Sequence, residues 1–326
     1  MRDQIIAEGI GMANPIGPLW PELPYGAWRD TRDTLQLWTQ IVGKIRLAQT
    51  PWVNHSWHVP LYLSSRGLST SPMTHGARSF EIQFDFIEHV LDITVSDGSA
   101  RRLALKPRSV ADFYGAVMSA LTELGIPVTI NENPCEIAGA VAFSKDMVHA
   151  AYDPIYAHRF WQVLLQSDRV LKEFRTCFLG KCSPVHFFWG SFDLAVTRFS
   201  GRAAPPFAGK TPGVTAAVMA EAYSHEVSSA GFWPGGNGTD YPTFYSYAYP
   251  QPAGFKGFVV QPAAAFFSET LGEYLLPYDA VRNAADTDAV LLDFLQSTYE
   301  AAAAGGHWDR AALECSRGRA GIPRAT

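Results

Sequence analysis

Histidine and carboxylate side chains that could do chemistry occur at three places in this sequence of 326 residues. Two of the places are stretches of apolar and β-branched residues that contain a histidine and an arginine, and the third, "YSHEVSS", contains adjacent histidine and glutamate. Imidazole and carboxylate groups are ordinary ligands of zinc and non-haem iron. The predicted metal ligands, for a divalent transition metal such as Fe or Zn, are His58, His186, His225 and Glu226.

The same stretches also allow chemistry without a metal. A histidine can act as a general base near neutral pH, and two arginines can bind a carboxylate or phosphate through paired hydrogen bonds. Cys182 lies four residues before His186, where a turn could bring a thiol to its base. Asp193 is either an ion-pair partner of Arg198 or of a lysine, or a group that orients a histidine or acts as a ligand. The predicted catalytic residues are His58, His186, Arg66, Arg198, Asp193 and Cys182.

None of these spacings is diagnostic, and a structural role is the alternative for each residue. Two histidines spaced as in "HSWH" point to opposite faces of a strand, so this motif carries little metal information. The imidazoles could simply be hydrogen-bonded where helices meet the sheet. The sequence has no GxGxxG followed by a helix, no P-loop and no GxSxG, which argues against nucleotide-binding and α/β-hydrolase classes.

The overall composition is that of a globular protein, with 47% hydrophobic and 17% charged residues. The net charge of -5 provides no basic field, so we expect no nucleic-acid partner. Neither a signal-like apolar segment nor the roughly eighteen-residue apolar run of a membrane helix is present, so we expect a cytoplasmic protein without a membrane partner. The aromatic content of 13% indicates either a large core or an aromatic-lined cavity.

Four amphipathic helices are predicted from apolar residues at three- and four-residue spacing. They cover residues 28–47, 110–124, 154 to about 179, and 288–304, and Ser109 and Asp153 provide N-caps for the second and third. In the first helix, Gln36, Gln40 and Lys44 fall on the face opposite the apolar stripe, which predicts a surface helix. Alternating residues over 80–86 and 91–95, followed by a turn at 97–98, predict an antiparallel meander.

Two further segments look like copies of each other, "NHSWHVPLYLSSRG" and "HFFWGSFDLAVTRFSG". Each follows a long helix, and in each a tryptophan precedes an arginine by nine residues, Trp57 and Arg66 in one and Trp189 and Arg198 in the other. Read as strands, they place alternate side chains on one face, with His58 and Arg66 together in the first. A pseudo-twofold packing of the copies would join these faces around a shared cavity, although a chance likeness is the alternative.

Several long strings, among them "WPELPYGAWRDTRDTLQLWTQIVGK" and "YSHEVSSAGFWPGG", make the chain resemble a family of uncharacterised bacterial proteins catalogued as a domain of unknown function. The resemblance extends over about residues 20–313. It implies a bacterial cytoplasmic protein and brings no activity, cofactor or catalytic residue.

The expected fold is α+β, an antiparallel sheet with four main helices largely on one face, in two related halves. The predicted parts are an N-terminal extension (1–19), a first half (20–130), a connection (131–153), a second half (154–309) and a loosely ordered tail (310–326). The leading functional hypothesis is an enzyme acting on a small molecule between the halves, with or without a metal. The alternatives are a non-catalytic binding protein for a small anionic or aromatic ligand and, third, an interaction scaffold.

Overall fold

The computed structural model describes residues 18–236 and 238–324. The predicted N-terminal extension, residues 1–19, therefore lies outside the described residues except for its last two positions. Within the described residues the chain forms seven α-helices and two antiparallel sheets of six strands each, which confirms the α+β class.

The first sheet is formed by residues 62–104. Its strands are β1 (Tyr62–Leu63), β2 (Gly67–Ser69), β3 (Met73–His75), β4 (Arg78–Asp85), β5 (Val90–Val95) and β6 (Ala100–Ala104). They follow the order β1-β2-β4-β5-β6, and β3 pairs with the other end of β4. Because Phe80 pairs with Val95 and β5 pairs with β6, the predicted meander is confirmed.

The second sheet is formed by residues 186–277. Its strands are β7 (His186–Phe188), β8 (Asp193–Ala203), β9 (His225–Trp233), β10 (Thr243–Tyr249), β11 (Phe266–Ser268) and β12 (Glu273–Pro277). They follow the order β11-β12-β10-β9-β8-β7. The two sheets meet at one point, where the backbones of Leu61 and Phe187 exchange a pair of hydrogen bonds.

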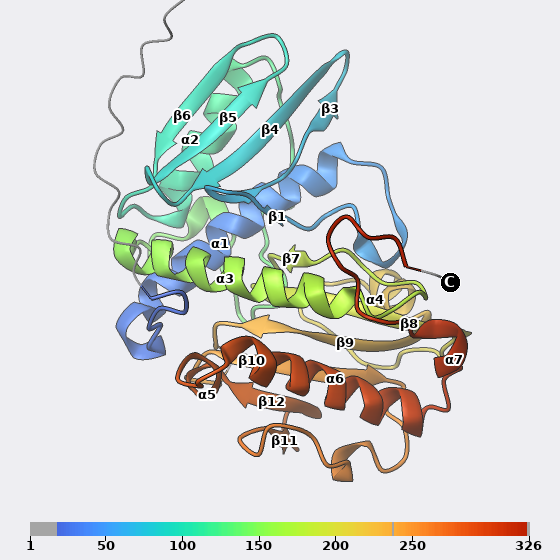
Figure 1. The fold of residues 1–326 in the computed structure, drawn as a ribbon. Coiled ribbons are helices and arrows are strands. Elements are labelled where there is room, and N and C mark those ends of the chain that lie inside the picture. The colour runs from blue at the N-terminus through green and yellow to red at the C-terminus, as the bar shows by residue number, and fades with distance from the viewer. Residues whose placement is uncertain (1–17, 237, 325–326) are drawn as a thin grey trace, which may run out of the picture.

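The four predicted helices are all present, but they pack against two sheets and not largely on one face of a single sheet. They are α1 (Tyr25–Gln49), α2 (Val110–Glu123), α3 (Pro154–Arg175) and α6 (Thr287–Gly305), and the shorter ones are α4 (Ala216–Ala222), α5 (Tyr278–Arg282) and α7 (Arg310–Leu313). The predicted caps are confirmed, since Ser109 accepts from the Asp112 N–H and Asp153 accepts from the N–H groups of Ile155 and Tyr156. Figure 1 shows α6 along the second sheet and α1 and α3 crossing between the sheets.

The prediction that α1 is a surface helix is wrong. Gln36, Gln40 and Lys44 are all buried, as is the apolar face that holds Trp38. The Trp38 ring stacks on Phe113 of α2 at 4.4 Å between ring centroids. The helix is therefore surrounded on most sides, and its polar face must find partners inside the protein.

The segment before β1 is not the predicted strand. Residues Asn54–Ser56 form a 3₁₀ turn, in which His55 and Ser56 have the left-handed φ values of 58° and 57°. This conformation reverses the chain between α1 and the first sheet, so alternate side chains of the segment do not share a face. Only Tyr62–Leu63 of the segment is in a strand.

The two segments taken as copies do not superpose as strands. The first contains the 3₁₀ turn and leads into the first sheet, whereas the second is a hairpin of β7 and β8 in the second sheet. The expectation of a pseudo-twofold cavity with two equivalent His–Arg faces is therefore not supported. The buried apolar residues of both sheets nevertheless form one continuous core.

A glycine of α1 marks the closest packing between this helix and the β7–β8 hairpin. A methyl group at the buried Gly43 would overlap the Trp189 indole, which cannot move freely because its N–H donates to the Val59 carbonyl at 2.9 Å. We expect Gly43→Ala to lower the free energy of unfolding by about 1–3 kcal/mol, measured by urea denaturation.

The matched control is Gly115→Ala in the exposed face of α2, where no described atom lies within 4 Å of the added methyl group. This change should raise stability by up to about 1 kcal/mol, because alanine favours a helix more than glycine does. Equal effects of the two substitutions would contradict the packing described for Gly43.

Candidate functional site

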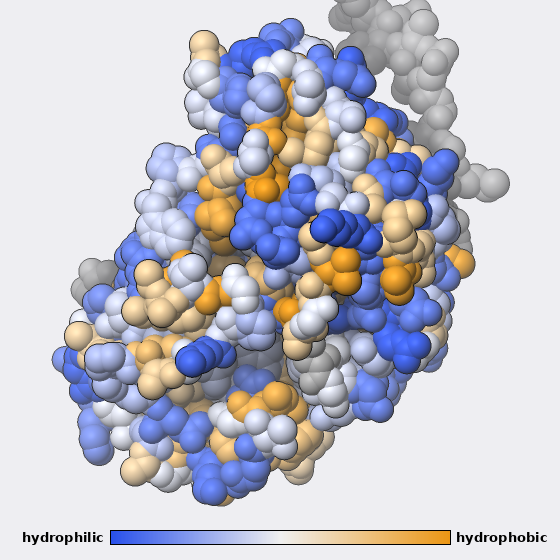
Figure 2. Space-filling view, turned by 180° about the vertical axis from the view of Figure 1, so that it is seen from behind, coloured by the Kyte–Doolittle hydropathy of each residue, from blue (hydrophilic) through white to orange (hydrophobic). Residues whose placement is uncertain are grey.

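A cavity of about 530 Å³ lies on the face of the second sheet opposite α3 and α6. Strands β7 to β10 form its floor, and the C-terminal end of α1, the loop around residues 129–136 and α4 form its walls. Figure 2 shows the surface on this side hollowed between the upper and lower parts of the molecule. The volume lies within the range of about 300–1,000 Å³ that small-molecule sites have.

Asp193 is the most deeply placed acid of this cavity. It begins β8, its side chain is only 8% exposed, and it accepts a hydrogen bond from the Tyr245 hydroxyl of β10. Burial, with a further contribution from the nearby charge of Glu136, raises the pKa of the Asp193 carboxyl to about 7, and the Tyr245 hydrogen bond opposes this shift only in part. Both the protonated and the ionised form are therefore populated near neutral pH.

Two other carboxyl groups lie close to Asp193. Glu136 lines the cavity from the loop before α3 and accepts a hydrogen bond from the Ser191 hydroxyl, and burial raises its pKa. Glu273 begins β12, next to β10, and burial together with the charge of Asp193 raises its pKa to about 7. In the described residues, none of the three forms an ion pair with a lysine, arginine or histidine.

His186 lines the cavity from β7 and is 1% exposed. Its ring packs edge-on against Tyr62 and Phe188, at 5.6 and 5.4 Å between centroids, and neither ring nitrogen has a hydrogen-bond partner among the described residues. Burial, and then the charges of Arg175 and Arg46, lower the pKa of His186 to about 3, so the ring is uncharged. Most buried polar groups have a hydrogen-bond partner, so an imidazole that lacks one at both nitrogens is unusual.

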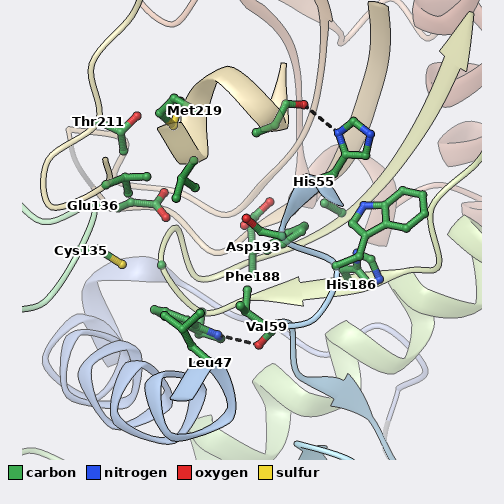
Figure 3. A pocket seen from close by; sticks show the side chains of 18 of the residues that line it. Leu47, His55, Val59, Cys135, Glu136, His186, Phe188, Asp193, Thr211 and Met219 are labelled. Carbon is green, nitrogen blue, oxygen red and sulfur yellow. Dashed lines mark hydrogen bonds between the residues drawn. The ribbon is translucent and has the colours of Figure 1, made fainter. Parts of the chain in front are cut away.

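His55 lines the cavity on the other side of Trp57. Its Nδ1 lies 3.3 Å from the Ala222 carbonyl (Figure 3). Its Nε2 lies 2.7 Å from the ammonium nitrogen of Lys181. Burial and the Lys181 charge lower the pKa of His55. His55 holds its left-handed backbone conformation at the cavity wall, where such strained positions are common in functional sites.

Helix α1 fixes the two loops that carry the acids. The Gln40 side chain donates to the Cys135 carbonyl and accepts from the Cys135 N–H, both at 2.9 Å, and Gln36 donates to the Gly190 carbonyl at 2.7 Å. Cys135 precedes Glu136 in the chain, and Gly190 lies in the turn before Asp193. The buried polar face of α1 therefore positions both carboxyl groups.

The other predicted catalytic residues lie outside the cavity in the part of the chain that the structure describes. Arg66 pairs with Asp85 at the edge of the first sheet. Arg198 points to the opposite face of β8, where it donates to the Phe174 carbonyl and its guanidinium lies 4.5 Å from the Tyr299 ring centroid. It is therefore not the partner of Asp193, because residues five apart in a strand face opposite sides.

Cys182 and His58 are also held in environments that do not favour a catalytic role. Burial raises the pKa of the Cys182 thiol, which disfavours the thiolate that a nucleophile requires. The His58 ring packs at 4.6 Å from Trp52, and its Nδ1 accepts from the Val53 N–H at 3.1 Å. His58 is buried behind the cavity wall and does not meet His186 across a shared face.

The four predicted metal ligands are not assembled. Glu226 pairs with Arg202 at 2.6 Å, and the His225 ring lies 5.9 Å from the His55 ring while its Nδ1 bonds the Ser224 hydroxyl. Among residues 18–236 and 238–324, no group of three or more His, Cys, Asp or Glu side chains is arranged to hold a metal ion. His58 lies outside any strand of the described structure, and Glu226 is paired with Arg202, so the predicted set does not converge.

Comparison with known protein families identifies the family of this chain. The family of unknown function DUF5996 matches residues 20–315. The chain belongs to this family. No curated protein and no solved structure matches it. Membership of DUF5996 confirms the resemblance seen in the sequence and carries no activity. Among the described residues, no helix has both the length and the apolar character needed to cross a bilayer.

Sequence reasoning found two of the cavity residues, His186 and Asp193, and missed the others. One usable signal was "TFYSYAY", in which alternate tyrosines must share a face of a strand. Glu136 had no such signal, because it lies in a loop whose position depends on contacts with α1. The missed polar residues are His55, Glu136, Tyr223, Tyr245 and Tyr247 of the cavity and the neighbouring Glu273.

The raised pKa of Asp193 predicts a particular dependence of stability on pH. In the unfolded chain the carboxyl ionises with a pKa of about 3.9, whereas in the folded protein its pKa is about 7. Stability from this group is thus fully present at low pH and is lost as the pH rises towards 7. Asp193→Asn does not carry this titration. The free energy of unfolding of the variant, relative to that of the parent, should therefore be higher at pH 8 than at pH 4.5 by at least about 1 kcal/mol in urea unfolding.

Asp85→Asn provides a control of opposite sign. Burial acts to raise the pKa of Asp85, but the hydrogen bonds from the N–H groups of Glu88 and Ile87 and from Arg66 outweigh it and the pKa is lowered. Asp85→Asn should therefore lose most stability at pH 8 and less at pH 3. If Asp193→Asn behaved in the same way, Asp193 would be a structural acid stabilised in its ionised form.

Proposed function

We propose that the protein is an enzyme that acts on a small molecule in the cavity, with Asp193 as the general acid and base. The observation that carries the proposal is the Asp193 carboxyl itself, buried in the cavity floor without a cationic partner among the described residues. Structural acids are normally paired or exposed, whereas catalytic acids are kept near neutral pKa by burial.

The surroundings of Asp193 suit proton transfer. The Tyr245 hydroxyl donates to one carboxylate oxygen, Oδ2, which fixes the orientation of the group and leaves Oδ1 for a substrate. The Glu136 charge adds to burial in making ionisation of Asp193 less favourable, which keeps a proton available at the carboxyl near neutral pH. His186 adds an uncharged imidazole to the lining, whose buried nitrogens have no partner among the described residues.

A metal is not part of this proposal. The donors that a metal would require lie in different parts of the described structure, with Glu226 bound to Arg202 and His58 behind the cavity wall. The reaction assigned to the site is acid–base chemistry on an organic substrate. Location in the cytoplasm and the absence of nucleic-acid partners remain predictions from the sequence.

The second candidate is a non-catalytic binding protein for an aromatic ligand. It is favoured by the aromatic side chains in the cavity wall, among them Trp52, Trp57 and Tyr223. Such rings bind flat apolar surfaces without any proton transfer. The two candidates differ in one respect only, whether Asp193 acts on the bound molecule.

A comparison of binding with turnover separates the candidates. Trp52, Trp57 and Trp189 line the cavity, so their fluorescence should report ligands from a metabolite panel, and mass spectrometry then follows conversion of each ligand that binds. Asp193→Asn should retain binding within a few-fold and lower turnover by about 100-fold or more, the usual effect of removing a general acid–base group.

The control variant is Asp293→Asn, which changes an exposed aspartate of α6 outside the cavity and should leave turnover unchanged. Undiminished turnover in Asp193→Asn would exclude the assigned role. Ligands that bind but are never converted by the parent protein would favour the binding protein.

A further inference from the structure

We infer that the cavity takes a substrate with a positively charged nitrogen, an ammonium or amidinium group, next to an apolar or aromatic part. The inference rests on the proposed function, because it names the substrate class of the same site. It is carried by the distribution of charged groups around the cavity and by the aromatic rings between them.

The acids of the site lack a partner of opposite charge. Asp193 is bonded by a tyrosine and Glu136 by a serine, and Glu273 follows on the next strand. A buried carboxyl without a cation normally costs folding free energy, and proteins keep such groups mainly where a ligand uses them. A bound cation would provide the missing charge for Asp193 and Glu136 together.

The basic groups nearest the cavity are already engaged or uncharged. Lys44 of α1 lines the cavity, where it donates to the Asn133 carbonyl at 2.6 Å and burial lowers its pKa, and Lys181 bonds His55 from outside the cavity lining. The His186 ring is uncharged, and burial followed by the Lys181 charge lowers the pKa of His55. None of these groups forms an ion pair with Asp193 or Glu136 in the described residues.

Two arginines act on His186 from behind the cavity lining. The Arg46 guanidinium lies 5.5 Å from the Tyr62 ring centroid and its Nε donates to the His58 carbonyl at 2.9 Å, and Arg175 contributes a charge but forms no part of the lining. The remaining titratable groups of the lining are the Cys135 thiol and three tyrosine hydroxyls, whose pKa values burial raises. These groups are neutral at physiological pH.

The aromatic rings of the cavity suit a cation. Tyr245 and Tyr247 stand nearly parallel on β10, 6.2 Å apart between centroids, and Trp57 also lines the cavity. The Lys181 ammonium already lies 5.1 Å from the Trp57 ring centroid and 4.6 Å from that of Phe199. Cations are attracted to the faces of such rings, most strongly where water is excluded.

His186 provides an independent sign that the cavity holds a polar ligand. Its side chain is 1% exposed, it lines the cavity, and both ring nitrogens lack a partner among the described residues. An uncharged imidazole accepts a hydrogen bond from an N–H group through one nitrogen without repelling a cation. Figure 3 shows Asp193 between Glu136 on one side and His186 on the other.

Binding of a cation must be linked to protons. The pKa of Asp193 is about 7 in the empty protein, and a cation beside the carboxyl favours its ionised form and lowers that pKa. Near neutral pH the protein should therefore release protons when a cation binds. Affinity for the cation should increase as the pH rises through about 7, with no such change for an uncharged ligand.

Three probes of similar size but different charge test the inference, namely benzylamine, which is protonated at the pH values used, benzyl alcohol and benzoate. Their affinities are measured by titration calorimetry at pH 8 and pH 5.5, in two buffers of different ionisation enthalpy to count released protons. We expect the cation to bind at least about tenfold more tightly than the alcohol at pH 8, with a smaller preference at pH 5.5 and proton release on binding. Benzoate should bind most weakly.

Variants show whether the preference comes from the named acids. Asp193→Asn and Glu136→Gln should each reduce the preference for the cation and leave benzyl alcohol binding unchanged, while Asp293→Asn should change neither. Having two variants protects the test against misfolding of one of them, which circular dichroism would reveal. Equal binding of the cation and the alcohol, or tighter binding of benzoate, would overturn the inference.

The result also separates this inference from the proposed function. Probes that bind without a charge preference, displaced by a converted ligand, would remove the substrate class and leave the acid–base role of Asp193 intact. A clear preference for the cation with no turnover of any amine would support the ligand class and remove the acid–base role of Asp193.

Discussion

The structure depends on the requirement that a buried polar helix face be hydrogen-bonded. Helix α1 is enclosed by the rest of the chain, so the amides of Gln36 and Gln40 cannot reach water. They bond the backbone at Gly190 and Cys135 instead, which are far away in the sequence. Leaving such groups unpaired would cost about 1–3 kcal/mol each, so the helix and the two loops must assemble together.

The same contacts link the fold to the candidate site. Cys135, which Gln40 holds, directly precedes Glu136, and Gly190, which Gln36 holds, lies in the turn before Asp193. Helix α1 therefore sets the positions of both acids. Gly43, one turn further along α1, allows Trp189 to pack against the helix between these two anchors. Rigid support from a buried helix is what a site needs in order to hold its groups in place before a ligand arrives.

The two acids of the cavity differ from the other buried charged groups of the protein in the partners that they have. Elsewhere, acids such as Asp85 and Asp288 are paired with arginines, and buried Arg198 is enclosed by aromatic rings and a carbonyl. In the cavity, the side chains of Asp193 and Glu136 accept hydrogen bonds from the hydroxyl groups of Tyr245 and Ser191 and have no cationic partner among the described residues. Local departures of this kind are expected at functional sites, where selection acts on chemistry as well as on stability.

The sequence alone determined the four long helices, two of their N-caps and the β4–β6 meander, because these depend on residues close together in the chain. It also marked His186 and Asp193 as unusual, since polar residues in an apolar stretch need a reason. Only the tertiary structure decided what surrounds them. The left-handed turn at His55 replaces the strand along which His58 and Arg66 were expected to share a face. The hydrogen bonds of buried α1 hold the loop that places Glu136 at the cavity. Partners of this kind are fixed by contacts between distant segments, and no local pattern of residues encodes which segments will meet.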